Sequence, residues 1–288
     1  MVSLFKRKTL KTIDKVSLDK EISEYSLSGV TGDDEIIVSL TSFPERMYEI
    51  HYTLYSLLTQ TVKPSKLILW LGEEQFPNKE KDIPKKVLDL CENGLTIGWY
   101  KNLYSYTKLI PTLNEYPNSI IVTADDDIYY EPNWLELLIK EHESSPEDIV
   151  CHRAHKIKLT NDSIAPYKKW SKKIGGRKPS YLNFLTGVGG VLYPPNVLYN
   201  DVLNTKLFEE LAPKADDVWF WAMAVLNHTK IKIVKDRIKE LTYVNPERER
   251  GLTNEKTLFS TNRQGGNDVQ LEKVLEHYPQ ILEIITEK

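Results

Sequence analysis

Three adjacent aspartates are the residues of this chain best suited to binding a cation. Asp125, Asp126 and Asp127 directly follow an apolar run, residues 120–124. A buried strand that ends in acids places them at the carboxyl edge of a sheet, where open α/β sheets bind ligands. Their mutual repulsion requires a counter-charge, and a hard divalent ion shared with substrate phosphates would supply it. A polar loop facing a helix N-terminus is the simpler explanation, but the apolar strand in front favours a site.

A second acidic pair opens a strongly apolar segment. Asp216 and Asp217 precede residues 218–226, which have the composition of a buried helix. Acids at this place are typical of a helix N-terminus, where the macrodipole stabilises the ionised carboxylate. We therefore expect a lowered pKa for Asp217. Helix capping alone explains the pair at this stage.

A glycine-rich stretch is the third candidate. Gly187, Gly189 and Gly190 lie within residues 185–195, which otherwise favour a strand. Such glycines mark either a close approach of the backbone to a ligand or a plain bulge. Their spacing differs from the dinucleotide fingerprint, which opens a helix after the first strand. Both explanations stay open on the sequence alone.

Alternating strand and helix patterns must position these groups. Short apolar runs and helical periodicities follow one another from residue 36 onward. The predicted strands are 36–40, 66–71, 95–99, 120–124, 148–155 and 231–234, and the predicted helices are 47–58, 83–90, 106–113, 134–143, 215–226 and 269–278. This order predicts a parallel sheet with helices on both faces.

Composition limits the classes of protein that remain. The 288 residues are 41% hydrophobic, with 38 basic and 41 acidic side chains, so the net charge of -3 gives no general nucleic-acid footprint. Cys91 and Cys151 match no metal-ligand spacing, and we expect two buried thiols in a reducing compartment. No apolar run approaches the roughly 18 residues of a membrane span, which predicts a cytoplasmic protein.

Three polar segments allow more than one interpretation. Residues 1–15 are basic and amphipathic, which suits either a solvated helix or peripheral contact with the inner membrane surface. Residues 156–178 carry many lysines between aromatic side chains, and could be a solvated loop or could meet an anionic substrate or a membrane. Residues 245–268 have the composition of a mobile loop, which we expect to act as a lid.

Several segments in order carry a resemblance to a known family. They are strand 36–40 with Thr41-Ser-Phe-Pro-Glu-Arg46, Gln60-Thr-Val-Lys-Pro64, strand 67–71, Tyr106-Thr-Lys108 and Val122-Thr-Ala-Asp-Asp-Asp-Ile-Tyr129. Together they resemble bacterial glycosyltransferases of the GT-A fold, of the family-two type that builds capsule, lipopolysaccharide and other surface polysaccharide. The resemblance covers about residues 35–234.

The resemblance implies a fold and a division of the chain. The fold is α/β, with a Rossmann-like, mostly parallel central sheet, helices on both faces and an appended acceptor half. Residues 1–34 would form a basic helical extension and linker, and residues 245–288 a mobile loop and helix. Residues 35–244 would form the GT-A domain, with a nucleotide-sugar half at 35–130 and an acceptor half at 131–244.

The resemblance also assigns roles to residues. Asp125 and Asp127 would hold Mn²⁺ or Mg²⁺ as the D-x-D motif, without an identified third protein ligand. Donor-binding residues would be Thr41, Pro44, Arg46, Lys108, Asp125 and Asp126, and acceptor-binding residues Gly189, Gly190 and Trp219. Asp217 would be the catalytic base beside Asp216, although the family more often has Glu-Asp at this place.

The implied reaction is a metal-dependent, inverting transfer of a sugar. The donor would be a nucleotide-diphosphate sugar, of the UDP type, and the acceptor a hydroxyl of a glycan or of a lipid-linked molecule. A sugar nucleotidyltransferase is an alternative, but residues 41–46 lack the glycine-rich loop that it requires. An aspartate-nucleophile phosphatase fits poorly, because Tyr129 stands where Thr or Val is usual. A non-enzymatic glycan-binding protein would not need the pair Asp216 and Asp217.

Overall fold

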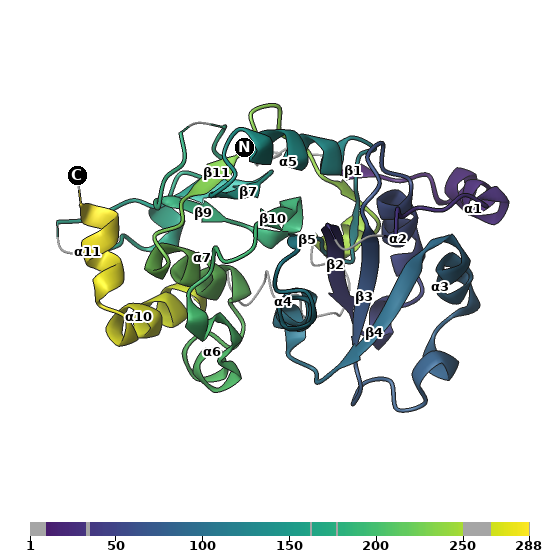
Figure 1. Ribbon diagram of the computed structural model, residues 1–288, viewed down its shortest axis with the longest axis horizontal. Helices are drawn as coiled ribbons and strands as arrows, with labels where there is room; N and C mark the ends of the chain where they lie inside the picture. Colours follow the sequence, from purple (N-terminus) through teal and green to yellow (C-terminus); the bar gives the residue numbers. More distant parts are fainter. Residues whose placement is uncertain (1–9, 33–34, 162, 177, 250–265, 288) are drawn as a thin grey trace, which may run out of the picture.

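A seven-stranded mixed sheet forms the centre of the protein (Figure 1). The computed structural model describes residues 10–32, 35–161, 163–176, 178–249 and 266–287. The strand order is β11-β7-β10-β5-β2-β3-β4. These strands are β2 (Ile36–Ser42), β3 (Lys66–Gly72), β4 (Leu95–Tyr100), β5 (Ile120–Thr123), β7 (Ile149–Cys151), β10 (Val191–Tyr193) and β11 (Ile231–Ile233).

The first half of the sheet is parallel, as the sequence predicts. β2 pairs in parallel with β3 and β5, and β3 pairs in parallel with β4. Successive residues of these strands are buried on opposite faces, because Val38 packs with one hydrophobic cluster and Ile37 with another. Burial on both faces explains why these strands are continuous apolar runs rather than alternating ones.

Helices cover both faces (Figure 1). One face packs against α2 (Ile50–Leu58), α3 (Lys85–Leu88) and α5 (Trp134–Glu143). The other packs against α4 (Ile110–Glu115) and α7 (Asp216–Leu226). The prediction of a two-faced α/β sheet is therefore confirmed.

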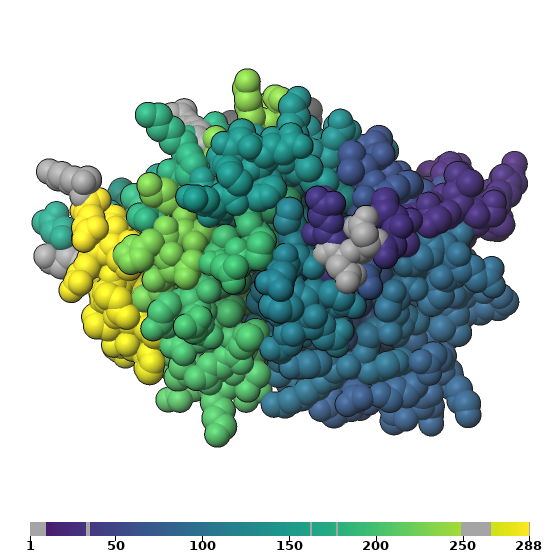
Figure 2. Space-filling model, in the orientation of Figure 1, coloured from purple at the N-terminus to yellow at the C-terminus, as the bar shows by residue number. Residues whose placement is uncertain are grey.

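The second half of the sheet turns antiparallel. β10 lies between β5 and β7 and is antiparallel to both, while β11 pairs in parallel with β7. Three further helices, α6 (Thr205–Leu211), α10 (Asn267–His277) and α11 (Gln280–Thr286), pack around α7. Covering on every side explains the apolar composition of α7. The end of the chain thus holds two helices where the sequence predicts one, and Figure 2 shows them at the end of the molecule opposite α1.

The prediction of one continuous strand over 148–155 is wrong. The chain forms β7, breaks at His152 and Arg153, and continues as β8 (Ala154–Lys156), which pairs with β9 (Asn183–Leu185) in a separate sheet. At the break the imidazole of His152 is buried, and it bonds to the Trp134 carbonyl oxygen at 2.9 Å and to the Ile238 amide at 3.3 Å. The break leaves Arg153 in a turn.

The N-terminal segment packs on the rest of the protein. Residues 1–9 of the basic segment lie outside the described residues. Its described end forms β1 (Lys11–Thr12), which pairs with β12 (Thr242–Tyr243), and β12 pairs with β6 (Ile128–Tyr129). The helix α1 (Lys15–Glu24) follows, with its N-terminus capped by Asp14 and its Leu18 packed beside α2. Among the described residues, the helix of this region therefore begins at Lys15, the last residue of the basic segment.

Two further expectations meet the structure here. Cys151 is buried but Cys91 is exposed, so the prediction of two buried thiols is wrong for Cys91. No helix in the described ranges is long and apolar enough to cross a bilayer. Of the predicted lid, the structure describes residues 245–249, which include α8 (Pro246–Glu249), and residues 266–268. Residues 250–265 lie outside the described residues, so the lid stays a prediction.

Candidate functional site

The three aspartates lie where β5 ends, at the carboxyl edge of the parallel strands. The side chains of Asp125 and Asp127 are 27% and 13% exposed, whereas that of Asp126 is 8% exposed. Asp126 turns inward, and its Oδ2 accepts a hydrogen bond of 2.5 Å from the Ser42 hydroxyl. The carboxylates of Asp125 and Asp127 therefore face the site, whereas that of Asp126 is held inside the protein by Ser42.

Arg46 supplies one counter-charge to this cluster. It ends the turn that follows β2, with Pro44 at the first position of that turn. Its Nη1 donates to Asp126 and, at 2.7 Å, to Asp127. Burial disfavours the charged guanidinium, but the two carboxylates outweigh burial and raise the pKa of Arg46. Arg46 therefore ties the first loop of the sheet to the aspartates, as a fixed cation.

Lys108 supplies the other counter-charge and joins the two acidic groups. Its Nζ lies 2.8 Å from Asp125 Oδ1 and 3.1 Å from Asp216 Oδ2. The residue is buried, which opposes its charge, but Asp125, Asp216 and Asp217 outweigh that cost and raise the pKa of Lys108 well above its usual value. A charged, buried lysine thus connects the aspartates after β5 with those that open α7.

Asp217 lies beside the same lysine, against the glycine turn, which is the 3-10 turn Gly187–Gly189. Its Oδ1 accepts a hydrogen bond of 2.9 Å from the Gly187 amide. A Cβ at Gly187 would lie 2.8 Å from Lys108 Nζ and 3.3 Å from Asp217 Oδ1. Gly187 is therefore a place of close approach to the backbone, as the sequence suggested. The groups that approach it are the side chains of Lys108 and Asp217 and not a ligand.

The expectation of a lowered pKa for Asp217 is wrong. Burial, and then the negative charge of Asp216, raise its pKa to about 7, although Lys108 and the Gly187 amide oppose the shift. The helix N-terminus of α7 does not overcome the loss of hydration. A carboxylate with this pKa takes up a proton readily near neutral pH, which suits a general base.

Asp125 and Asp127 fit a divalent ion whose coordination is completed by a bound ligand. Among the described side chains of the site, five carboxylates face the two cations Arg46 and Lys108, so negative charge remains to be neutralised. No group of three or more His, Cys, Asp or Glu in the described residues forms a complete metal site. Asp125 and Asp127 would therefore hold Mn²⁺ or Mg²⁺ together with phosphates and water, which is usual for such ions.

Three further residues that the sequence predicts in the site, Thr41, Gly189 and Gly190, bond or pack within the protein. Thr41 lies close to this edge, but its hydroxyl donates to the Trp70 carbonyl oxygen at 2.9 Å. Gly189 and Gly190 are buried, and a Cβ at Gly190 would lie 2.4 Å from the Trp134 ring. Gly190 also has φ +93°, a conformation that favours glycine. Packing explains these two glycines, so they do not line the site as predicted.

Trp219 is a core residue. Its exposed fraction is 0%, and its Nε1 donates to the Val202 carbonyl oxygen at 3.3 Å. Its ring packs between Phe208 and Tyr278. The prediction that Trp219 contacts the acceptor is therefore wrong, because α6 and the C-terminal helices bury the whole side chain.

Sequence reasoning missed three residues that shape the site. Ser42 holds Asp126, and the hydroxyl of Tyr130 accepts a hydrogen bond of 2.8 Å from the Asp125 amide. Arg153 lies in the turn after β7, where its carbonyl oxygen accepts from the Thr186 amide at 3.0 Å. Strand alternation points Ser42 to the side opposite Thr41 and could have indicated it. Nothing in the sequence marks Arg153, because the break after β7 is not visible there.

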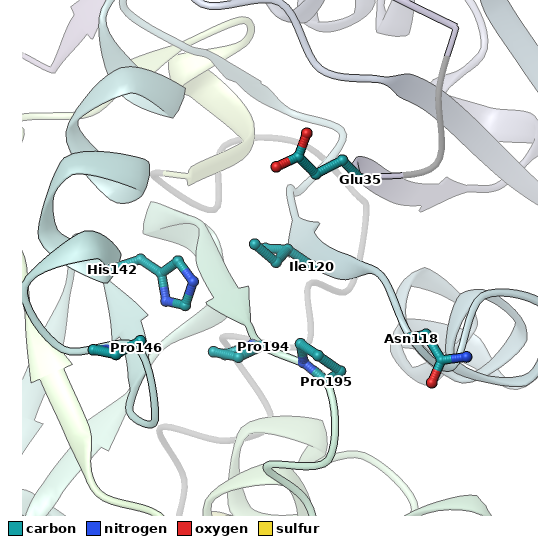
Figure 3. Close-up of a pocket in the computed structure, with 7 residues that line it drawn as sticks. All are labelled: Glu35, Asn118, Ile120, His142, Pro146, Pro194 and Pro195. Carbon is teal, nitrogen blue, oxygen red and sulfur yellow. The ribbon is translucent and has the colours of Figure 1, made fainter.

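A cavity elsewhere has no connection with these groups. It has a volume of about 400 Å³ and lies near the beginnings of β2 and β5, at the opposite edge of the sheet. Figure 3 shows Glu35, Ile120 and His142 around it. Its lining residues are Glu35, Asn118, Ile120, His142, Pro146, Pro194 and Pro195. Ligands of open α/β sheets bind at the carboxyl edge, so the aspartate edge remains the candidate site.

The comparisons with known proteins concern one segment of the sequence and the fold. Residues 111–208 match the family model described as Glycosyl transferase family 2. This segment runs from α4 into α6 and includes the aspartates after β5 and the glycine turn. No curated protein sequence matches the chain.

The similarity to one solved structure supports the fold. S. aureus TarS 1-349 in complex with UDP-GlcNAc is similar with a TM-score of 0.51 and 15% identity, over 86% of this chain and 70% of that chain. S. aureus TarS 1-349 alone has a TM-score of 0.48 and 14% identity, over 85% and 73%. A CMP:2-keto-3-deoxy-manno-octonic acid synthetase with CTP has 0.45 and 11%, over 80% and 99%. The chain has the α/β GT-A fold that the resemblance implied.

Proposed function

We propose that this protein is an inverting, metal-dependent glycosyltransferase. It would move a sugar from a nucleotide-diphosphate sugar, of the UDP type, to a hydroxyl of a glycan or a lipid-linked acceptor. One observation carries the proposal. A single buried cation, Lys108, contacts Asp125 at the donor edge and Asp216 beside the candidate base. Donor binding at Asp125 and acceptor activation beside Asp216 would thus take place next to the same ammonium group.

The comparisons support this choice of substrate class. The segment similar to family 2 glycosyl transferases contains the D-x-D aspartates. A structure of the same fold was solved with UDP-GlcNAc. Hexose or N-acetylhexosamine transfer in the synthesis of surface polysaccharide is the more specific form of our proposal.

The donor side would neutralise the leaving group. Asp125 and Asp127 would hold Mn²⁺ or Mg²⁺ with the diphosphate, and the ion would stabilise the negative charge that develops as the sugar–phosphate bond breaks. Arg46 holds Asp127 and Asp126 in place through its guanidinium. These fixed charges keep the site organised before the donor binds, which lowers the cost of reorganisation during reaction.

The acceptor side would activate the nucleophile. A sugar hydroxyl has a high pKa, so a base must take its proton as the oxygen attacks the anomeric carbon. Asp217 would accept this proton, the new C–O bond would form, and the nucleoside diphosphate would leave from the opposite face. Attack opposite the leaving group inverts the anomeric centre. Asp216, held by Lys108, would orient the acceptor.

A donor-binding experiment tests this proposal. We expect a nucleotide-diphosphate sugar to raise the melting temperature in the presence of Mn²⁺, because a ligand that binds only the folded state stabilises it. Asp127→Ala should abolish the Mn²⁺-dependent shift and leave a folded protein. Asp82→Ala is a control, because Asp82 lies in the turn before α3 and its carboxylate bonds to Asn78 rather than to a residue of the site. Full transfer activity in EDTA would contradict the metal requirement, and turnover of a nucleoside triphosphate with a sugar phosphate would indicate a nucleotidyltransferase.

A further inference from the structure

Two cations, Arg153 and Lys172, lie around Tyr167, near the loop that holds Asp217. The Tyr167 amide donates a hydrogen bond to Asp268 at 2.6 Å. The Arg153 carbonyl oxygen accepts from the Thr186 amide at 3.0 Å, and the next residue, Gly187, donates to Asp217 at 2.9 Å. The turn that carries Arg153 is therefore fixed to the loop that holds the candidate base.

The guanidinium of Arg153 includes a buried donor that is unpaired within the described residues. Its Nε is buried and has no hydrogen-bond partner in the described part of the chain, and no described acid forms an ion pair with it. A buried donor without a partner costs free energy, so such groups normally meet a ligand or water. Gly189 makes room for the side chain, because a Cβ there would lie 2.8 Å from Arg153 Cβ.

Lys172 brings a second cation to the same place. Its Nζ lies 3.0 Å from the centroid of the Tyr167 ring. Burial, together with the charge of Arg153, lowers the pKa of Lys172 to about 8, although the charge of Asp268 opposes the shift. Burial, followed by the charge of Asp217, raises the pKa of Tyr167 to about 12, with Arg153 opposing. Tyr167 is therefore close enough to Asp217 and Arg153 for both charges to affect its pKa, and Lys172 lies over its ring.

We propose that Arg153 and Lys172 bind a phosphate ester of the acceptor, next to the hydroxyl that Asp217 deprotonates. This inference rests on the proposed function and specifies its acceptor. A guanidinium fork and an ammonium group together suit a tetrahedral oxyanion. The donor diphosphate belongs to the other side of the site, at Asp125 and Asp127. For residues 156–178 the sequence suggested contact with an anionic substrate or a membrane. Of the lysines in this segment, Lys172 is the one that takes part in the proposed site.

Direct binding of sn-glycerol 3-phosphate tests the site without a donor. We expect calorimetric titration to show binding to the wild-type protein and an affinity at least tenfold lower in Arg153→Gln. Lys172→Gln should weaken binding in the same direction, and it serves as a second variant if the first fails to fold. The double variant Lys168→Gln, Lys169→Gln is the matched control, because both lysines are exposed neighbours on the same segment. Equal binding by all variants, or no binding by the wild type, would overturn the proposal.

Transfer assays then identify the source of the phosphate. Release of nucleoside diphosphate should be stimulated by glycerol phosphate, by vesicles of phosphatidylglycerol, or by both, and each stimulation should be lost in Arg153→Gln. Stimulation that persists in Arg153→Gln would contradict the inference. The thermal shift by donor and Mn²⁺ separates the two proposals, because it fails only if the glycosyltransferase assignment is wrong. Absence of glycerol phosphate binding by the wild-type protein, together with an intact donor shift, would overturn the acceptor site alone.

Discussion

Replacement of Asp217 by asparagine is expected to lower kcat by roughly 10²-fold or more, the usual contribution of a general base. Asparagine keeps the shape of the side chain, and its carbonyl oxygen can still accept the hydrogen bond from the Gly187 amide. Only the proton acceptor is lost, so the affinity for the donor should change little. Initial rates at saturating donor, together with the donor-induced thermal shift, measure the two effects separately.

The pH dependence gives an independent check of Asp217. Its pKa is raised to about 7, so the base form predominates above that pH and is lost below it. We therefore expect kcat of the wild type to fall as the pH drops through about 7, and the residual activity of Asp217→Asn to lack this fall. An inactive Asp216→Asn beside a normal Asp217→Asn would reverse the two roles. Normal rates in both variants would reduce the pair to a helix cap and contradict the inverting mechanism.

Replacement of Lys108 by methionine should be the most destabilising change at the site. The ammonium group is buried between Asp125 and Asp216, and methionine removes its charge at similar length. Removing one partner of a buried ion pair leaves an uncompensated carboxylate and typically costs about 3–5 kcal/mol. We expect a loss of this order in the free energy of unfolding, measured by urea denaturation.

Lys101→Met is the matched control for this measurement. Lys101 pairs with Glu209 at 3.1 Å, but the two side chains are 60% and 50% exposed. An exposed pair contributes little, so the control should change stability by no more than about 0.5 kcal/mol. If Lys108→Met is as stable as this control, the aspartates around Lys108 do not depend on its charge, and the connection between the two acidic groups is not as we describe.

The parallel half of the fold was readable from the sequence for a physical reason. Strands buried on both faces give continuous apolar runs, and the helices between them show a clear period. The antiparallel half gives weaker patterns, because β7, β8, β9 and β10 have three residues each. A strand of three residues is shorter than the patterns that indicate strands. The break at His152 therefore escaped prediction, and with it the position of Arg153.

The acidic residues of the site could be predicted from the sequence, but the raised pKa of Asp217 could not. Asp125, Asp127 and Asp217 stand at the ends of elements, which the sequence order reveals. The raised pKa of Asp217 depends on burial by residues distant along the chain, and no spacing reports burial depth. The same limit explains Trp219, whose residue type suits both a sugar-binding platform and a core position. Packing of α6 and the C-terminal helices around α7 decides for the core.

A crystal structure with a nucleotide-diphosphate sugar and Mn²⁺ tests the central claim most directly. The donor would be the one that gives the largest thermal shift, and Asp217→Asn would be used to prevent turnover. We predict that the diphosphate and the ion lie at Asp125 and Asp127, with the anomeric carbon facing residue 217 on the side opposite the diphosphate. A donor bound away from this edge, or one whose diphosphate lies between the anomeric carbon and residue 217, would contradict the account.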